Sequence, residues 1–184
     1  AFDTRPVVAE QVQSLGGKFV EIDLGETGQT KDGYAQELTA EQLELQRLGM
    51  KDVISESDIV ITTAQLFGRP APRIVTADMV AAMKKGGVIV DMAVDSGGNV
   101  EGSKPDETVE IDGVSIIGVS NLPAQVSSDA SQMYSSNLYN LVSEYWDEES
   151  KIFKLDLEDD ILKGCVITHE GGLVNEAIKN IRGS

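Results

Sequence analysis

The sequence is poor in the residues that build disulfide frameworks and metal centres. It holds one cysteine and one histidine, so the lone Cys165 cannot form a disulfide within the chain. A structural zinc site needs about four ligands at set spacing. We therefore predict no metal site, and we interpret His169 as a loop histidine and Cys165 as a small buried thiol. The acidic run at 156–160 lacks the EF-hand pattern and its glycine, which indicates a solvated face.

Positive charge is also scarce. Fifteen basic residues stand against thirty-one acidic ones, which gives a formal net charge of -16. Binding to a phosphate backbone depends on concentrated positive charge, so we expect no nucleic acid as a partner. The acidic excess either serves solubility or complements a basic partner domain.

Long apolar runs are missing as well. No run approaches the ~20 residues of a membrane-spanning helix, and the first residues lack the basic and apolar regions of a signal peptide. We expect no direct insertion into a membrane. The lone thiol indicates a reducing, cytoplasmic compartment, and 41% hydrophobic with 25% charged residues is typical of a globular domain.

What the sequence does contain is an alternation of helical and strand patterns. Helices are predicted at 5–15, where Gly16 and Gly17 end the pattern, and at 39–49, where Thr39 and Gln42 form a capping-box pattern. A third helix is predicted at 76–87 with Thr76 as its cap.

Strands are predicted at 19–22, 58–64 and 87–93. The last two are nearly continuous apolar runs, as in parallel strands covered on both faces. The Asp112-Gly113 pair lies between two β-rich runs and predicts a hairpin. This alternation predicts an α/β fold, a Rossmann-like doubly wound parallel sheet.

We expect two domains. Residues 1–125 form the C-terminal part of a Rossmann-like NAD-binding domain, whose first βα unit would lie before residue 1. Residues 126–184 form a long helix and a tail that belong to a second lobe. Apolar residues such as Met133, Leu138 and Val142 recur at helical spacing, so we expect this helix to pack against another surface. The tail predicts two short strands and a last short helix.

Asp3 follows a short apolar pair and precedes a helical pattern. In a dinucleotide-binding fold the second strand ends in an acidic side chain that accepts hydrogen bonds from the adenosine ribose. Asp3 fits that position, although a turn or N-cap aspartate would give the same pattern. The glycine-rich turn G-x-G-x-x-G would come ~20 residues earlier, and none of the eighteen glycines forms a G-x-G.

Long segments resemble a known family. They are FDTRPVVAEQVQSLGGKF, DGYAQEL, DIVITTAQLFGRPAPRIVTADMVAAMKKGGVIVDMAVDSGGN and SNLPAQVSSDASQMYSSNLYNL. They resemble domain I of the α subunit of proton-translocating nicotinamide nucleotide transhydrogenases, from Ala1 to about Leu173. The resemblance implies a peripheral NAD(H)-binding domain that passes hydride to NADP(H) on a partner domain.

The resemblance also implies an assembly. It implies a homodimer in which the hairpin at Asp112 takes part, and a place in the cytoplasm at the inner membrane, through NADP-binding and membrane subunits. The cofactor-binding residues that it implies, together with those expected beyond the carboxyl ends of parallel strands, are Asp3, Thr4, Arg5, Gly33, Tyr34, Ala64, Gln65, Asn121 and Leu122.

Among these residues, Gly33 and Tyr34 would belong to a mobile loop that folds over the nucleotide and excludes water, as lids do. The alternative for Tyr34 is an aromatic residue packed on the surface. Direct transfer between nicotinamides requires no acid or base from the chain, because the cofactor carries the chemistry.

Two alternatives stay open. The related alanine dehydrogenases have similar VIVDMAVDSGG and GRPAP segments and an aspartate at the position of Asp95, near nicotinamide and substrate. Asp95 is therefore our catalytic candidate, and it favours the NAD-dependent oxidative deamination of alanine. The loop with Gly33 and Tyr34 favours the transhydrogenase. A catalytically silent NAD-binding module is the third possibility.

Overall fold

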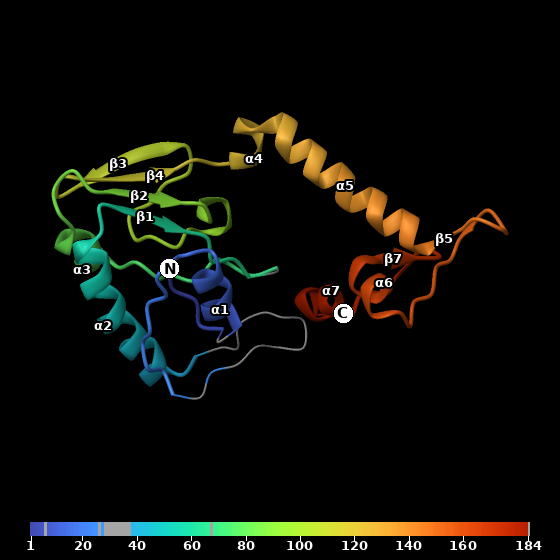
Figure 1. Ribbon diagram of the computed structural model, residues 1–184, viewed down its shortest axis with the longest axis horizontal. Coiled ribbons are helices and arrows are strands. Elements are labelled where there is room, and N and C mark those ends of the chain that lie inside the picture. The colour runs from blue at the N-terminus through green and yellow to red at the C-terminus, as the bar shows by residue number, and fades with distance from the viewer. Residues whose placement is uncertain (6, 26, 28–37, 67, 184) are drawn as a thin grey trace. The chain divides into compact units, whose positions relative to one another are not determined.

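The computed structural model describes residues 1–5, 7–25, 27, 38–66 and 68–183 (Figure 1). They form two compact units, Ala1–Ser120 and Asn121–Ser184. A domain boundary after residue 125 stays a prediction.

The first unit is built on a four-stranded sheet in the order β1-β2-β4-β3 (Figure 1). Its strands are β1 Ile59–Thr62, β2 Val88–Asp91, β3 Glu107–Ile111 and β4 Val114–Gly118. Strands β1, β2 and β4 are parallel, and β3 is antiparallel to β4. The parallel strands confirm the α/β prediction.

The predicted hairpin joins β3 to β4. Asp112 and Gly113 both have positive φ, at 53° and 83°. Positive φ at both central residues defines the two-residue type I′ turn, whose twist matches that of the strands. The Asp-Gly pair therefore predicted the turn and its register correctly.

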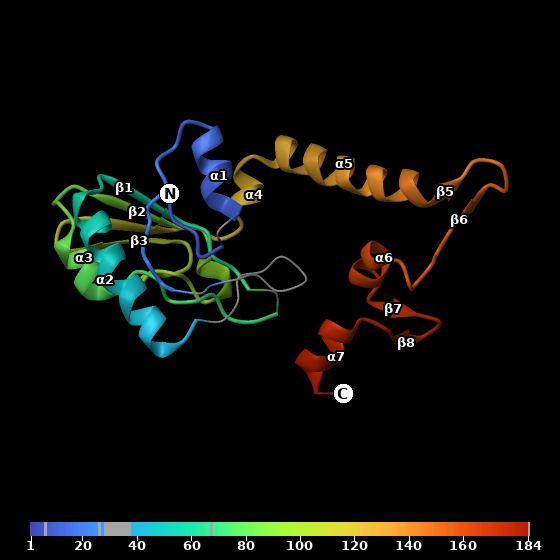
Figure 2. The ribbon, with the colours of Figure 1, turned by 60° about the horizontal axis from the view of Figure 1, so that its bottom comes forward.

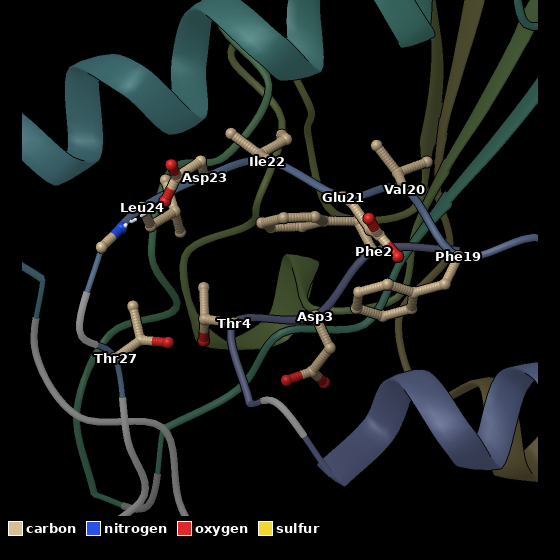
Figure 3. Close-up of a pocket in the computed structure, with 11 residues that line it drawn as sticks. Phe2, Asp3, Thr4, Phe19, Val20, Glu21, Ile22, Asp23, Leu24 and Thr27 are labelled. Atoms are coloured by element: carbon tan, nitrogen blue, oxygen red, sulfur yellow. Dashed lines mark hydrogen bonds between the residues drawn. The ribbon is translucent and has the colours of Figure 1, made fainter.

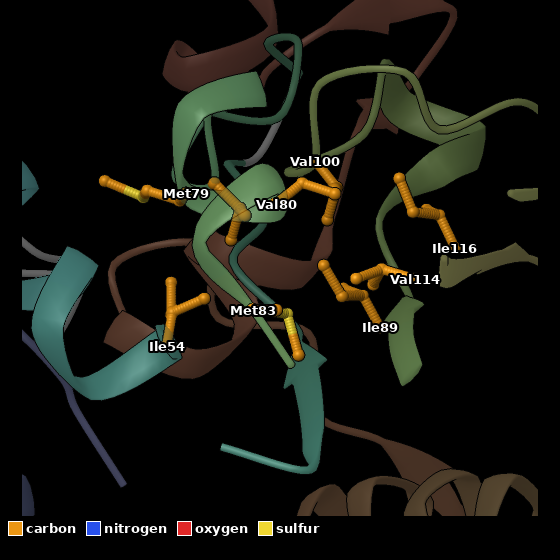
Figure 4. Close-up of a cluster of buried hydrophobic side chains, with 9 residues drawn as sticks. Ile54, Met79, Val80, Met83, Ile89, Val100, Val114 and Ile116 are labelled. Carbon is orange, nitrogen blue, oxygen red and sulfur yellow. The ribbon is translucent and has the colours of Figure 1, made fainter. Parts of the chain in front are cut away.

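Helices α2 (Ala40–Glu56) and α3 (Ala77–Ala82) cover one face of the sheet. Figure 4 shows side chains of α3 beside those of the strands. The core consists of Ile54, Val75, Met79, Val80, Met83, Ile89, Val100, Val114 and Ile116. It rests the sheet on the two helices and leaves the carboxyl ends of β1 and β2 free to lead into loops.

Strand β1 departs from the prediction of two covered faces. Ile59 and Ile61 are 66% and 61% exposed, whereas Val60 packs against the core. Side chains alternate along a strand, so only every second residue of β1 meets the helices. Among the described residues, nothing covers the other face of β1.

The predicted strand at 19–22 is not a strand in the structure. Helix α1 (Val7–Ser14) precedes it. The Ala1 amino group donates to the Lys18 carbonyl at 2.6 Å, and the Val20 amide donates to the Ala1 carbonyl at 2.7 Å. These two bonds flank Phe19 in the pattern of a parallel pair. A strand needs a ladder of such pairs, and here the segment is extended but makes only one.

The two predicted helix caps differ in outcome. At α2 the capping box is confirmed, because the Gln42 amide donates to the Thr39 hydroxyl and the Thr39 amide donates to the Gln42 side chain. At α3 the prediction of a side-chain cap is wrong. The Thr76 hydroxyl donates to the Asp78 carboxylate at 2.5 Å, and Glu101 accepts from the Ala77 amide at 2.7 Å instead.

The second unit begins with α4 (Leu122–Gln125) and α5 (Ser127–Tyr145), which confirms the long helix. The tail holds more elements than predicted: β5 Trp146–Asp147, β6 Ile152–Phe153, α6 Asp160–Cys165, β7 Thr168–His169, β8 Gly172–Leu173 and α7 Glu176–Arg182. Strands β5 and β6, and β7 and β8, form two small antiparallel pairs.

Two expectations about the second unit are wrong. The apolar residues of α5 do not pack within the described chain, since Met133 is 70%, Leu138 45% and Val142 50% exposed. Cys165 is exposed rather than buried, because it lies at the end of the short helix α6. Asp159, from the acidic run, accepts from two amides at the start of α6.

Candidate functional site

A small pocket lies where the first residues of the chain run beside the segment from Phe19 to Leu24 (Figure 3). Its volume is about 180 Å³, and Asp3 and Thr4 line it. Sites for drug-sized ligands span roughly 300–1,000 Å³. The pocket therefore fits a portion of a dinucleotide, such as its ribose, rather than the whole.

Arg5 holds the Asp3 carboxylate. The Arg5 amide and its Nε donate to Asp3 Oδ1 at 2.8 and 3.0 Å, and Nη2 donates to Oδ2 at 2.8 Å. Burial alone would raise the pKa of Asp3, but the hydrogen bonds and the charge of Arg5 outweigh burial and hold that pKa below its ordinary value. The same contacts raise the pKa of Arg5. Asp3 is thus an anion at neutral pH.

The Asp3 carboxylate keeps capacity for a ligand. A carboxylate offers about four acceptor positions, and Arg5 uses three of them. The side chain is 26% exposed. The carboxylate is therefore oriented by its neighbour, reachable from solvent and able to accept from one ligand hydroxyl.

A second group of candidates lies on the loops that follow β1 and β2. Ala64 and Gln65 come directly after β1, and Asp95 lies in a 3-10 turn, η1 (Val94–Ser96), after β2. The Gln65 side chain donates to the Met92 carbonyl at 3.3 Å and thus joins the two loops. Gln65 and Asp95 are exposed, and Ala64 is half-buried. The carboxyl ends of parallel strands are where ligands bind in this class of fold.

Two buried polar residues of these loops were not predicted from the sequence. Asp91 and Asn99 are both fully buried. The Asp91 carboxylate accepts from the amides of Ala93, Asn99 and Val100 at 3.0–3.1 Å. The available signal was Asp91 at the end of an apolar strand, followed by a Gly-Gly-Asn sequence, because buried polar side chains require partners.

The structure brings together only some of the predicted residues. Asp3, Thr4 and Arg5 lie at the pocket, and Ala64, Gln65 and Asp95 lie on the two loops. Asn121 and Leu122 belong to the second unit, where Asn121 precedes α4 with φ 49°. Gly33 and Tyr34 lie outside the described residues.

Two further features limit the chemistry of the described chain. Among the residues whose placement is given, no three His, Cys, Asp or Glu side chains gather where a metal ion could bind. No described helix has the length and apolar character to cross a membrane.

Known proteins match nearly the whole chain. A family model described as alanine dehydrogenase/PNT, C-terminal domain, matches residues 1–176. The NAD(P) transhydrogenase subunit alpha of Rhodospirillum rubrum, in the first of its polypeptides, is 39% identical over 180 residues, which cover 97% of this chain and 47% of that polypeptide. The alanine dehydrogenase of Halomonas elongata is 32% identical over 133 residues, 70% of this chain and 35% of that protein.

The fold also matches a solved structure. The crystal structure of a transhydrogenase from Sinorhizobium meliloti superposes with a TM-score of 0.66 at 34% identity, over 96% of this chain and 42% of that one. The chain spans about half the length of the curated relatives it matches.

Proposed function

The chain belongs to the alanine dehydrogenase/PNT C-terminal domain family, and from this we propose that it is part of the NAD(H)-binding domain of an NAD(P) transhydrogenase. The observation behind the choice within the family is the extent of similarity. The transhydrogenase subunit is 39% identical over 97% of the chain, against 32% over 70% for the alanine dehydrogenase.

The chain's own residues would bind and orient the nucleotide. When bound, NAD(H) supplies the hydride acceptor or donor at its nicotinamide ring. Asp3, fixed by Arg5, accepts a hydrogen bond from an adenosine ribose hydroxyl, and Thr4 lines the same pocket. The neutral amide of Gln65 offers polar contacts on the loop after β1.

The backbone of Ala64 is already paired. Its amide donates to the Asn99 side chain at 3.0 Å, and its carbonyl accepts from that side chain at 2.9 Å. Ala64 therefore contributes mainly a methyl surface to the nucleotide, while Gln65 contributes hydrogen bonds. Gly33, Tyr34, Asn121 and Leu122 complete the proposed set of cofactor contacts. Because transfer occurs between two oriented rings, the main contribution of the protein is geometric.

The proposal includes an assembly. The complete protein would be a homodimer, with the β3–β4 hairpin taking part, and NADP(H) would bind on a partner domain or subunit. It would lie on the cytoplasmic side of the inner membrane, attached through membrane subunits. These properties are inferred from the resemblance and from relatives that are named as subunits.

The test uses the complete polypeptide that contains these residues, combined with its NADP-binding and membrane partners. We expect reduction of an NAD analogue by NADPH, followed by absorbance. The reaction should require both components. The proposal fails if the combined components bind both nucleotides but transfer no hydride.

Asp95 favours a second candidate, an alanine dehydrogenase. Its carboxylate is exposed on the turn after β2, where it could reach a small substrate. NADH production from L-alanine and NAD without any partner would establish this activity. Nucleotide binding with neither reaction would indicate the silent module.

A further inference from the structure

The loops after β1 and β2 are joined through one buried side chain, that of Asn99. Its Oδ1 accepts from the Ala64 amide at 3.0 Å, and its Nδ2 donates to the carbonyls of Ala64 and Pro72 at 2.9 and 2.8 Å. All of the amide's donors are used, and its oxygen has a donor. The reverse orientation of the amide would place oxygen against two carbonyls, so the hydrogen-bond pattern defines this one.

The Asn99 backbone continues the connection. Its carbonyl accepts from the amides of Ile74 and Val75 at 2.8 and 3.0 Å. Thus one residue holds the loop after β1 at its beginning, near Ala64, and at its end, before α3. The long excursion between these two points is closed by contacts to a single position.

Asp91 in turn holds Asn99. Its carboxylate accepts from the Asn99 amide at 3.1 Å and closes the loop after β2 onto the end of that strand. The approach is close at Gly98, whose φ is 79° and where an added Cβ would lie 2.7 Å from Asp91 Oδ2. Only glycine combines this backbone conformation with this contact.

We propose that Asp91 and Asn99 are positioning residues that hold the Ala64–Gln65 segment in its nucleotide-binding conformation before the nucleotide arrives. The inference rests on the proposed function. Neither residue needs to touch the cofactor, since both are fully buried. They act by fixing the backbone that presents Gln65, and a small displacement of a binding segment has a large effect on binding and rate.

The main test is Asn99→Asp in the complete polypeptide combined with its NADP-binding and membrane partners. This change keeps the size of the side chain but turns two donors into an oxygen that faces the carbonyls of Ala64 and Pro72. We expect the KM on the NAD(H) side to rise roughly ten- to hundredfold. The KM for NADPH should stay unchanged, which separates positioning from a general loss of fold.

Asn175→Asp is the matched control. Asn175 is also buried, its Nδ2 donates to the carbonyls of Lys163 and Gly164, and its Oδ1 accepts from the Ile178 amide. The same chemical change there should lower stability without changing the NAD(H)-side KM of the folded fraction. Equal effects of the two variants on that KM, or none in a folded Asn99 variant, would overturn the inference.

Hydrogen exchange of the unsubstituted protein gives a second test that needs no variant. The Ala64, Ile74 and Val75 amides, which donate to Asn99, should be protected without nucleotide. Protection that appears only on NADH binding would show that the segment is not held beforehand and would overturn the inference. If hydride transfer and NADH binding are absent while these amides are protected, the proposed function has failed instead.

Discussion

Asp3 is the residue on which nucleotide binding should depend most directly. Asp3→Asn keeps the size of the side chain but removes the charge and one acceptor oxygen. We expect it to weaken NADH binding by the complete polypeptide roughly ten- to hundredfold, because a hydrogen bond to a charged group contributes about 1.5–3 kcal/mol. Isothermal titration calorimetry measures the change.

Asp23→Asn is the control for Asp3. Asp23 lines the same pocket, and its carboxylate accepts from the Gly25 amide at 3.0 Å. The substitution removes the same charge from the pocket but no group that we assign to the ribose. If both variants weaken NADH binding equally, the charge of the pocket matters and Asp3 has no special role.

Asp3 and Asn99 show which site residues a sequence can reveal. Asp3 is oriented by Arg5, two residues away, and its pattern can be recognised locally. Asn99 is bonded to Ala64 and Pro72, which lie 35 and 27 residues away. Such partners depend on the pairing of β1 with β2, so no local pattern could have assigned them.

Among the elements, helix α2 depends on its capping box for a well-defined start. Thr39→Ala removes the oxygen that accepts from the Gln42 amide. We expect the first turns of α2 to lose about 1 kcal/mol of stability, measured as faster hydrogen exchange of their amides. Thr76→Ala is the control, because the Thr76 side chain caps no amide of α3. Equal loss of protection in the two helices would contradict this prediction.

Helices α2 and α3 are also joined by an ion pair that responds to acid. The hydrogen bond from Lys51, with that from Thr76 and the charge of Arg47, lowers the pKa of Asp78 from 3.8 to about 2. A lowered pKa means that the pair stabilises the fold fully above the ordinary value and is lost as the pH falls through about 2. NMR titration of the Asp78 carboxyl carbon should show this midpoint, and a midpoint near the ordinary value would exclude the pair in solution.

Asp78→Asn should remove this share of the acid dependence of unfolding. Asp52→Asn is its control, because Asp52 is an exposed carboxylate of α2 outside the ion pairs of the described chain. The effect should shrink with added salt, since the Asp78 side chain is 46% exposed.

The elements that the sequence predicted well are those whose pattern is local. Caps, helical spacing and the Asp112-Gly113 turn act within a few residues. The segment at 19–22 failed because a strand exists only where a neighbour supplies a ladder of hydrogen bonds. The exposed face of β1 failed for a related reason, since burial depends on what other segments of the molecule cover.

At the scale of the whole molecule, the described chain leaves apolar surface uncovered in each unit. Ile59 and Ile61 are exposed on β1, and Met133 and Leu138 are exposed on α5. Composition and periodicity predicted these residues to be buried, because both reflect the complete fold. The family resemblance reached further than the patterns, since it depends on long matching segments rather than on local physics.

The last prediction concerns nucleotide binding by the 184-residue chain on its own. Its pocket at Asp3 has a volume of about 180 Å³ and fits only a portion of a dinucleotide. Pyrophosphate is usually held by a glycine-rich turn at a helix N-terminus, and the chain contains no G-x-G. We therefore expect the dissociation constant for NADH to exceed about 1 mM, or about -4 kcal/mol of binding free energy. Calorimetry with the complete polypeptide as control measures this. Sub-millimolar binding by the 184 residues would mean that their own contacts, without a glycine-rich turn, are sufficient to hold the cofactor.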